Sequence, residues 1–314
     1  MTPTDAILQP RYTGIASFMR APIATDWTGV EIGLIGVPFD GGVTNRTGAR
    51  HGPRGLREAS TLMRAGNQMT RTMPFQLARI ADLGDAIPDH PYDCTASIED
   101  LTRYFHRVQD AGIIPVSAGG DHSVTLPIFR GIARDRPVGM VHFDAHCDTG
   151  DQYHGCKFHH GAPFRRAVEE GLLDPKRTIQ IGIRGGLNDI DLWKFSFDSG
   201  MRVIMMDEFT RMGIDAVIAE ARRVVGDGPT YVSFDVDGLD PVYAPGTGTP
   251  EVGGITTVEA LAILRGLRGI DCIGGDVVEV APPWDPSGMT ALTGATILYE
   301  ILCLAAESVA RRRG

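Results

Sequence analysis

Short apolar runs rich in β-branched residues alternate with longer amphipathic stretches along most of this chain, from about residue 31 onward. The runs predict strands over residues 30–37, 77–83, 113–117, 138–143, 178–183, 202–205, 230–234 and 272–279. Apolar residues that return at helical spacing predict helices over 97–111, 214–225 and 257–267. This alternation predicts an α/β fold with a mostly parallel sheet covered on both faces, which binds ligands beyond the carboxyl ends of its strands.

No Pro/Ser-rich linker, low-complexity tract or internal repeat interrupts this pattern. We therefore expect a single catalytic domain over residues 29–314, preceded by an N-terminal arm of residues 1–28. The arm contains Tyr12, Phe18, Met19 and Trp27, and disordered arms are usually poor in aromatic residues. Part of the arm is thus expected to dock on a protein surface.

Three segments at predicted strand ends carry residues that can bind metal. Extended residues two apart project to the same side, so Asp144, His146 and Asp148 are expected to share a face. The same spacing brings Asp235 and Asp237 together after the next strand of this kind. His122 follows a glycine pair that permits a tight turn after residues 113–117. The segments together predict a cluster of histidines and aspartates at one edge of the sheet.

Four crowded aspartates would repel one another and become protonated unless cations lie among them. Two divalent ions would cancel their formal charge, and oxygen-rich ligation with one imidazole per ion suits Mn²⁺ best, with nickel, cobalt or iron as alternatives. Two such ions about 3.5–4 Å apart can share a water and lower its pKa toward neutrality. Hydrolysis is therefore the predicted reaction class.

Four neighbouring residues have simpler interpretations. We interpret His142 as a packed histidine that supports the site, and Asp240, before a proline, as a turn residue. Cys147 alternates to the face opposite the ligands, which favours a small buried side chain. Asp121 either orients a ligand or binds metal, and the sequence leaves both roles open.

Charge and composition argue against a nucleic-acid-binding, secreted or membrane protein. The formal net charge is -9, which argues against a nucleic-acid partner. The N-terminus lacks the pattern of a signal peptide, and no apolar run approaches the roughly 20 residues that span a membrane. The cysteines (Cys94, Cys147, Cys156, Cys272 and Cys303) are odd in number and widely spaced, as in reduced proteins. We expect a soluble, cytoplasmic protein with no membrane partner and no disulfide framework.

The motifs GGDHS (119–123), HFDAHCDT (142–149) and SFDVDGLDP (233–241) resemble those of the ureohydrolases, the family of arginase, agmatinase, guanidinobutyrase and guanidinopropionase. Further stretches such as GVPFDGG, APGTGTPEVGG and VVEVAPPWD extend the resemblance from about residue 31 to the C-terminus. The resemblance implies a three-layer α/β/α fold around a parallel eight-stranded sheet. It also implies a binuclear manganese centre and homotrimers or homohexamers.

The resemblance also implies roles for single residues. One ion would be bound by His122, Asp144, Asp148 and Asp235, and the other by Asp144, His146, Asp235 and Asp237, with Asp144 and Asp235 bridging. Glu279 would pair with the substrate guanidinium, and a metal-bridging hydroxide would attack the guanidinium carbon to release urea and an amine. Asp148 would pass a proton to the leaving amine, and His160, with His159 as the alternative, would exchange protons with solvent.

The sequence looks most like the guanidino-acid branch of this family, which suggests 3-guanidinopropionate or 4-guanidinobutyrate as substrate. Candidate contacts to the substrate tail are Arg46, Tyr153, Lys157, His159, Arg184 and Asn188. The loop 153–159 is rich in aromatic and imidazole groups, which is not typical of a carboxylate pocket. Agmatine is therefore an alternative substrate. Another is a substituted guanidine or biguanide such as dimethylbiguanide, which a nickel-dependent hetero-oligomer would hydrolyse. Arginase activity and a single-zinc deacetylase are less favoured, and an inactive structural subunit of a hetero-oligomer is the rival from another class.

Overall fold

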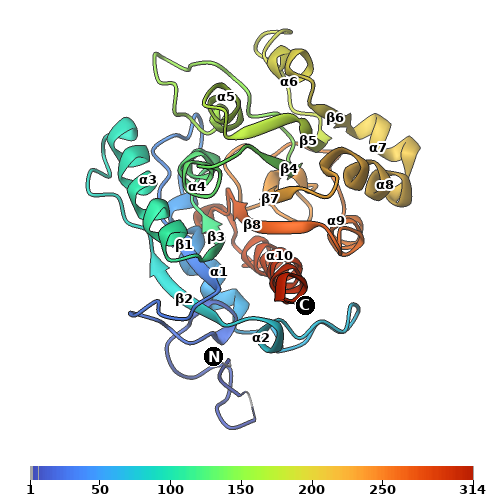
Figure 1. Ribbon diagram of the computed structural model, residues 1–314. Helices are drawn as coiled ribbons and strands as arrows, with labels where there is room; N and C mark the ends of the chain where they lie inside the picture. The colour runs from blue at the N-terminus through green and yellow to red at the C-terminus, as the bar shows by residue number, and fades with distance from the viewer. Residues whose placement is uncertain (1–2, 6, 314) are drawn as a thin grey trace.

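The computed structural model describes residues 3–5 and 7–313, and its centre is an eight-stranded sheet in which every pairing is parallel. The strand order is β2-β1-β3-β8-β7-β4-β5-β6 (Figure 1). The strands are β1 (Ile32–Val37), β2 (Ile80–Asp85), β3 (Ile114–Gly119), β4 (Val138–Phe143), β5 (Leu173–Ile183), β6 (Arg202–Met205), β7 (Pro229–Asp235) and β8 (Asp271–Val278).

Helices form a layer on each side of this sheet. They are α1 (Gly52–Ser60), α2 (Pro74–Leu77), α3 (Cys94–Asp110), α4 (Thr125–Ile132), α5 (Pro163–Glu169), α6 (Lys194–Ser199), α7 (Met206–Met212), α8 (Ile214–Val225), α9 (Thr257–Gly266) and α10 (Met289–Arg313). Helices α3, α4 and α5 cover one face, and α1, α8, α9 and α10 cover the other (Figure 1). The predicted three-layer α/β/α fold is thus confirmed.

Both faces of the sheet are buried, which explains why the strands read as continuous apolar runs. Leu34 and Ile35 are adjacent on β1, yet each belongs to a different hydrophobic core, one on each side of the sheet. The larger core includes α10, whose length and hydropathy alone would allow it to cross a membrane. Because 78% of its most apolar window is buried inside the molecule, α10 is a core helix of this domain.

Strand and helix boundaries follow the predictions at most ends. The predicted strands 138–143 and 202–205 and the helix 214–225 match β4, β6 and α8. The prediction for 77–83 was wrong at its start, since residue 77 ends α2 and β2 begins at Ile80. Strand β5 begins five residues before the predicted start, because Leu173 pairs with Val138 and the polar residues between it and Thr178, where the register shifts, carry no apolar signal.

The second half of the N-terminal arm packs on the domain. Phe18 and Met19 are buried, and the Phe18 amide donates to Asp82 Oδ2 at 2.9 Å. Trp27 meets the ring of Tyr104 edge-on, with 5.8 Å between ring centroids. Tyr12, in contrast, is exposed.

Candidate active site

The candidate site lies beyond the carboxyl ends of four neighbouring strands, β3, β8, β7 and β4. His122 begins the short 3-10 helix that follows β3, and Asp144, His146 and Asp148 follow β4. Asp235 ends β7, and Asp237 lies in the next 3-10 turn. Adjacent parallel strands end at the same edge, which brings these segments together although up to 115 residues separate their members.

The first group that could hold a metal ion surrounds His122. Its Nδ1 atom lies 3.1 Å from Asp144 Oδ2, 3.0 Å from Asp148 Oδ2 and 3.2 Å from Asp235 Oδ2. Among the described residues, this buried nitrogen has no partner with hydrogen-bond geometry. Such a convergence of an imidazole nitrogen and three carboxylate oxygens fits a divalent ion better than an ordinary hydrogen bond.

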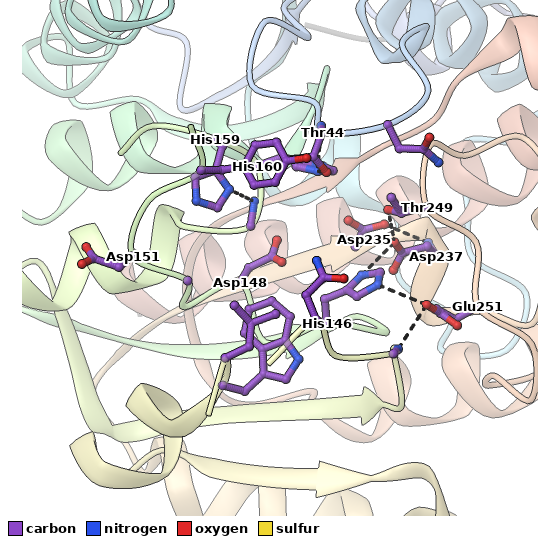
Figure 2. A pocket seen from close by; sticks show the side chains of 18 of the residues that line it. Thr44, His146, Asp148, Asp151, His159, His160, Asp235, Asp237, Thr249 and Glu251 are labelled. Carbon is purple, nitrogen blue, oxygen red and sulfur yellow. Dashed lines mark hydrogen bonds and ion pairs between the residues drawn. The ribbon is translucent and has the colours of Figure 1, made fainter. Parts of the chain in front are cut away.

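The second group surrounds His146. Its Nδ1 atom lies 3.4 Å from Asp144 Oδ1 and 3.2 Å from Asp237 Oδ2, as Figure 2 shows for Asp237. Asp144 therefore presents one oxygen to each group, as a bridging ligand would. Asp235 belongs to the first group by geometry, so its bridging role stays a prediction.

Electrostatics at these carboxylates also favour cations. Burial, together with repulsion from Asp237 and Asp144, raises the pKa of Asp235 well above its ordinary value. Burial alone would lower the pKa of His122, but the carboxylates of Asp144 and Asp148 raise it well above the ordinary imidazole value. Buried charges of one sign at this density require compensation, and divalent ions supply it.

Buried polar side chains form hydrogen bonds that orient the candidate metal-binding residues. Gln180 donates its amide to Cys147 O at 2.6 Å and to His142 Nδ1 at 3.0 Å, so the His142 Nε2 proton points to Asp144 at 2.8 Å. His142 is therefore placed to orient Asp144, in agreement with its interpretation as a supporting histidine. Cys147 itself is fully buried.

His122, the histidine of the first group, is held by a network of hydroxyl groups and one carboxylate. His122 Nε2 lies 2.9 Å from Ser233 Oγ, which donates to Asp276 Oδ1 at 2.8 Å. The buried Asp276 also accepts from Thr125 and Tyr231, at 2.7 and 2.9 Å. These contacts fix the ring of His122 from the side away from the carboxylates.

Close backbone packing shapes the loops that carry the ligands. A Cβ atom on Gly120 would lie 1.6 Å from the carbonyl oxygen of Phe39, so this position must be glycine. Asp121 accepts from the backbone amides of Gly42 and Ser123, at 2.7 and 2.9 Å, and joins these loops. These contacts favour an orienting role for Asp121.

Two of the candidate catalytic residues have a left-handed backbone. Asp148 has φ 52° and Glu279 has φ 62°, which is uncommon for residues other than glycine. Such strain persists where the surrounding structure holds it, often at functional sites. Asp240, in contrast, accepts from Val242 and Gly253 amides, as a turn residue does.

Glu279 and His160 form an ion pair next to His122. Glu279 Oε1 lies 2.9 Å from His160 Nδ1 and also accepts from the His122 amide at 2.9 Å. The His160 Nε2 atom lies 2.7 Å from Thr44 Oγ1. Burial would lower the pKa of His160, but the Glu279 carboxylate raises it to about 9. Glu279 Oε2 is buried and, in the described part of the chain, has no hydrogen-bond partner.

His159 has a different environment from His160. Burial lowers its pKa to about 4, and its Nδ1 accepts from the Gly161 amide at 3.2 Å. Both histidines line the same cavity, but it is His160 that contacts Glu279.

A cavity of about 360 Å³ opens over the two metal groups (Figure 2). Its walls include His146, Asp148, Asp235 and Asp237 from these groups. Most of the remaining lining side chains are polar or aromatic, and these include Thr44, Asn45, Asp151, Tyr153, His159, His160, Asn188, Trp193, Thr249 and Glu251. Glu279 lies behind this wall and is only 1% exposed.

Three of the predicted tail contacts do not line the cavity. Arg46 donates to the carbonyls of Thr247 and Gly248 and stacks on Trp284, with 4.8 Å to the ring centroid. Arg184 donates to a ring of backbone carbonyls that includes those of Asp237, Leu239 and Glu251. Lys157 is exposed on the loop surface. The structure therefore gives both arginines a role in holding loops, whereas Tyr153, His159 and Asn188 do face the cavity.

The cavity also contains residues that the sequence analysis did not select. Thr249 donates to Asp237 Oδ2 at 3.2 Å, and Glu251 Oε1 lies 3.8 Å from His146 Nε2 (Figure 2). Both belong to the stretch APGTGTPEVGG, which carried part of the family resemblance without an assigned role. That stretch was the available signal for this wall of the cavity.

Comparisons with known proteins agree with this geometry. The sequence model of the Arginase family matches residues 30–304. A guanidinopropionase from Pseudomonas aeruginosa is 58% identical over 98% of this chain and 97% of its own, and a guanidinobutyrase from the same organism is 43% identical over 94% and 93%. The solved structure of a proclavaminate amidino hydrolase from Streptomyces clavuligerus is 37% identical with a TM-score of 0.91, covering 95% of this chain and 99% of that one. The chain therefore belongs to the arginase family and is a hydrolase that acts on carbon–nitrogen bonds of guanidino compounds.

Proposed function

We propose that this enzyme hydrolyses a small guanidino acid, 3-guanidinopropionate or 4-guanidinobutyrate, to urea and an amine. Its similarity to a guanidinopropionase and a guanidinobutyrase supports this class of substrate. The observation that carries the proposal is the buried Glu279 Oε2, an acceptor that lies next to His122 and His160 and has no partner among residues 3–5 and 7–313. A guanidinium remains protonated in proteins, and a free carboxylate oxygen is its natural complement.

Two divalent ions are proposed at the two groups, one held by His122, Asp144, Asp148 and Asp235 and the other by Asp144, His146, Asp235 and Asp237. The unpartnered His122 Nδ1 and the oxygen-rich donor set fit such ions. We propose Mn²⁺, with Ni²⁺ as the alternative. When bound, the ions would activate a water molecule and stabilise developing negative charge.

The protein's own groups would then orient the substrate and move protons. Glu279 would hold the guanidinium through Oε2, and because this carboxylate is 1% exposed, the substrate must open the cavity wall next to His160. Asp148 faces the cavity and would carry a proton toward the leaving amine (Figure 2). His160, held between Glu279 and Thr44, would exchange that proton with solvent.

The substrate tail would lie against Tyr153, His159 and Asn188, which offer hydroxyl, imidazole and amide donors to a carboxylate. The charges of the cavity favour a second candidate, a substrate with a cationic or uncharged tail such as agmatine or a substituted guanidine or biguanide. Within residues 3–5 and 7–313, no lysine or arginine lines the cavity, whereas Asp151 and Glu251 do. A carboxylate tail would meet these acids without an opposing cation.

An inactive subunit of a hetero-oligomer is the rival proposal. The complete set of metal-ligand candidates, together with Glu279 and His160, weighs against it, since unpaired buried charges are costly to retain. A homotrimer or homohexamer, a nickel-dependent hetero-oligomer and a cytoplasmic location remain proposals that rest on the family resemblance and on the sequence.

The test is urea release by enzyme loaded separately with Mn²⁺ and Ni²⁺, against 3-guanidinopropionate, 4-guanidinobutyrate, agmatine, arginine, guanidine and dimethylbiguanide. Turnover of one linear guanidino acid supports the main proposal. Turnover of agmatine, guanidine or the biguanide alone supports the second candidate. No turnover with about two ions bound per chain would overturn both and favour the inactive subunit.

Glu251→Gln separates the first two outcomes further. Removing this negative charge should lower KM for a guanidino acid and raise it for a cationic substrate. Asp240→Asn provides a matched control, since Asp240 is an acid of a nearby turn outside the cavity.

A further inference from the structure

Two of the cysteines meet at the rim of the candidate active site. Cys94 is the first residue of α3, Cys156 lies on the loop after β4, and their Sγ atoms are 3.9 Å apart. In sequence they are 62 residues apart. All five cysteines of the chain are free thiols in the structure, and Cys94 and Cys156 are the two that are not fully buried.

Cys156 also closes a tight hairpin at the mouth of the cavity. The backbones of Tyr153 and Cys156 exchange two hydrogen bonds, each 2.9 Å long. His154 and Gly155 between them have φ values of 47° and 80°, as in turns with two left-handed residues. Tyr153 lines the cavity and lies 6.0 Å from the His159 ring, so a movement of Cys156 would move a wall of the cavity.

The two thiols differ in their surroundings. Cys94 Sγ donates to the Phe158 carbonyl at 3.3 Å, and Cys156 Sγ donates to Cys94 Sγ. Burial, with the neighbouring Cys156, raises the pKa of Cys94 and keeps it a thiol. Cys156 lies on the outer loop between exposed residues, 151–155 before it and Lys157 after it, so we assign it as the sulfur that is oxidised first.

We propose that Cys94 and Cys156 form a redox-sensitive thiol pair that a hydroperoxide oxidises to a disulfide, fixing the Tyr153–Cys156 hairpin to the start of α3. The Cys156 sulfur attacks a peroxide oxygen, which breaks the O–O bond and gives a sulfenic acid and one water or alcohol. The Cys94 sulfur then attacks the sulfenic sulfur, and a second water leaves with the thiol proton. The peroxide is reduced by two electrons, and the two thiols are oxidised by two.

The geometry allows this bond with a movement confined to the loop. The Sγ atoms must approach from 3.9 Å to about 2.05 Å. Helix α3 is anchored by buried side chains such as Ile98 and Leu101, whereas residues 151–155 are exposed. The hairpin therefore moves toward the helix. The pair would stay reduced in a reducing compartment and close only under oxidative stress.

The first test maps thiols in the metal-loaded enzyme before and after a small excess of hydrogen peroxide. Free thiols are alkylated in denaturant, and tryptic peptides are analysed by mass spectrometry. The expected result is a peptide that links Cys94 to Cys156, loss of two free thiols and reversal by dithiothreitol. Cys147, Cys272 and Cys303, all buried, serve as internal controls and should remain alkylated. Five alkylated thiols, or a link to another cysteine, would overturn the proposal.

Two variants test the order of events. In Cys94→Ser, peroxide should leave a sulfenic acid at Cys156 that dimedone traps, whereas Cys156→Ser should give no sulfenic acid at Cys94. The opposite pattern would overturn the assignment of Cys156 as the first sulfur oxidised. Because these readouts require neither substrate nor turnover, they stand apart from the proposed function.

A proteolysis experiment tests whether the disulfide fixes the hairpin. Lys157 follows Cys156 on the exposed loop, so trypsin should cut there in the reduced enzyme. Oxidation should slow this cut at least several-fold in wild type and leave the rate unchanged in Cys156→Ser. An unchanged rate in the linked protein would show that the hairpin is not held.

Discussion

Replacing Ser233 by alanine is expected to weaken metal binding although Ser233 is not itself a metal ligand. Its single hydroxyl proton goes to Asp276 Oδ1, 2.8 Å away, so its oxygen must accept the Nε2 proton of His122 at 2.9 Å. This arrangement leaves the His122 Nδ1 lone pair free to face the three carboxylates. Without the hydroxyl, the proton can move to Nδ1, where it blocks the ion.

Loss of a partner that orients a metal ligand typically costs about 10- to 100-fold in affinity, or about 1.4–2.8 kcal/mol. The assay is competition between the protein and a chelator for Mn²⁺, with thermal unfolding measured in parallel. Thr125→Val is the matched control, since Thr125 donates to the same Asp276 at 2.7 Å but does not contact His122. It should cost about 1 kcal/mol of stability and leave Mn²⁺ affinity within about twofold. Equal losses of affinity in both variants, or none in Ser233→Ala, would refute the reasoning.

Three further predictions concern the ion pair, pH and the loop arginine. Glu279→Gln should lower kcat/KM by about 100-fold or more while the metal content stays unchanged, because a neutral amide cannot pair with the guanidinium; unchanged kinetics would contradict that role. Because Glu279 raises the pKa of His160 to about 9 from 6.5, this group's contribution to stability is complete below pH 6.5 and is lost as pH rises through 9. Chemical denaturation of the metal-free protein should therefore show a loss of roughly 3 kcal/mol over this interval that His160→Asn lacks, and parallel pH curves would contradict the ion pair. Arg184→Ala should reduce the free energy of unfolding by about 2–4 kcal/mol through lost hydrogen bonds to carbonyls, whereas exposed Lys157→Ala should change it by less than about 0.5 kcal/mol; equal effects would exclude the loop-holding role.

The sequence predicted that the candidate metal-binding residues would converge, and the structure brings them together for a different reason. Alternation along an extended strand placed Asp144, His146 and Asp148 on one side. In the structure these residues lie beyond the end of β4, and Asp148 has a left-handed backbone. Their convergence comes from a folded loop and from neighbouring strands that end at one edge, which a two-residue period cannot describe.

The walls of the cavity were harder to predict because they depend on contacts between distant loops. Arg46 and Arg184 have the charge expected of a carboxylate-binding residue, but their guanidinium groups donate to backbone carbonyls. Thr249 and Glu251 lie in an irregular segment without apolar periodicity, so only the family resemblance of the stretch APGTGTPEVGG pointed to them. Residue type and spacing can therefore locate candidate catalytic residues at strand ends. The hydrogen-bond partners of long polar side chains depend on loops that come together only in the folded chain.

The strand order determines when during folding the group around His122 can assemble. The last strand in the chain, β8, lies between β3 and β7, and Gly275 is in register with Val116 on one side and Val232 on the other. Until residues 271–278 insert, the sheet exists as two separate halves, with His122 on one half and Asp144, Asp148 and Asp235 on the other. The second group, Asp144, His146 and Asp237, lies entirely on one half, whereas the first group needs both halves. Assembly of the first group must therefore follow the folding of the C-terminal segment, and a chain that ends before β8 would lack the first group but could still form the second.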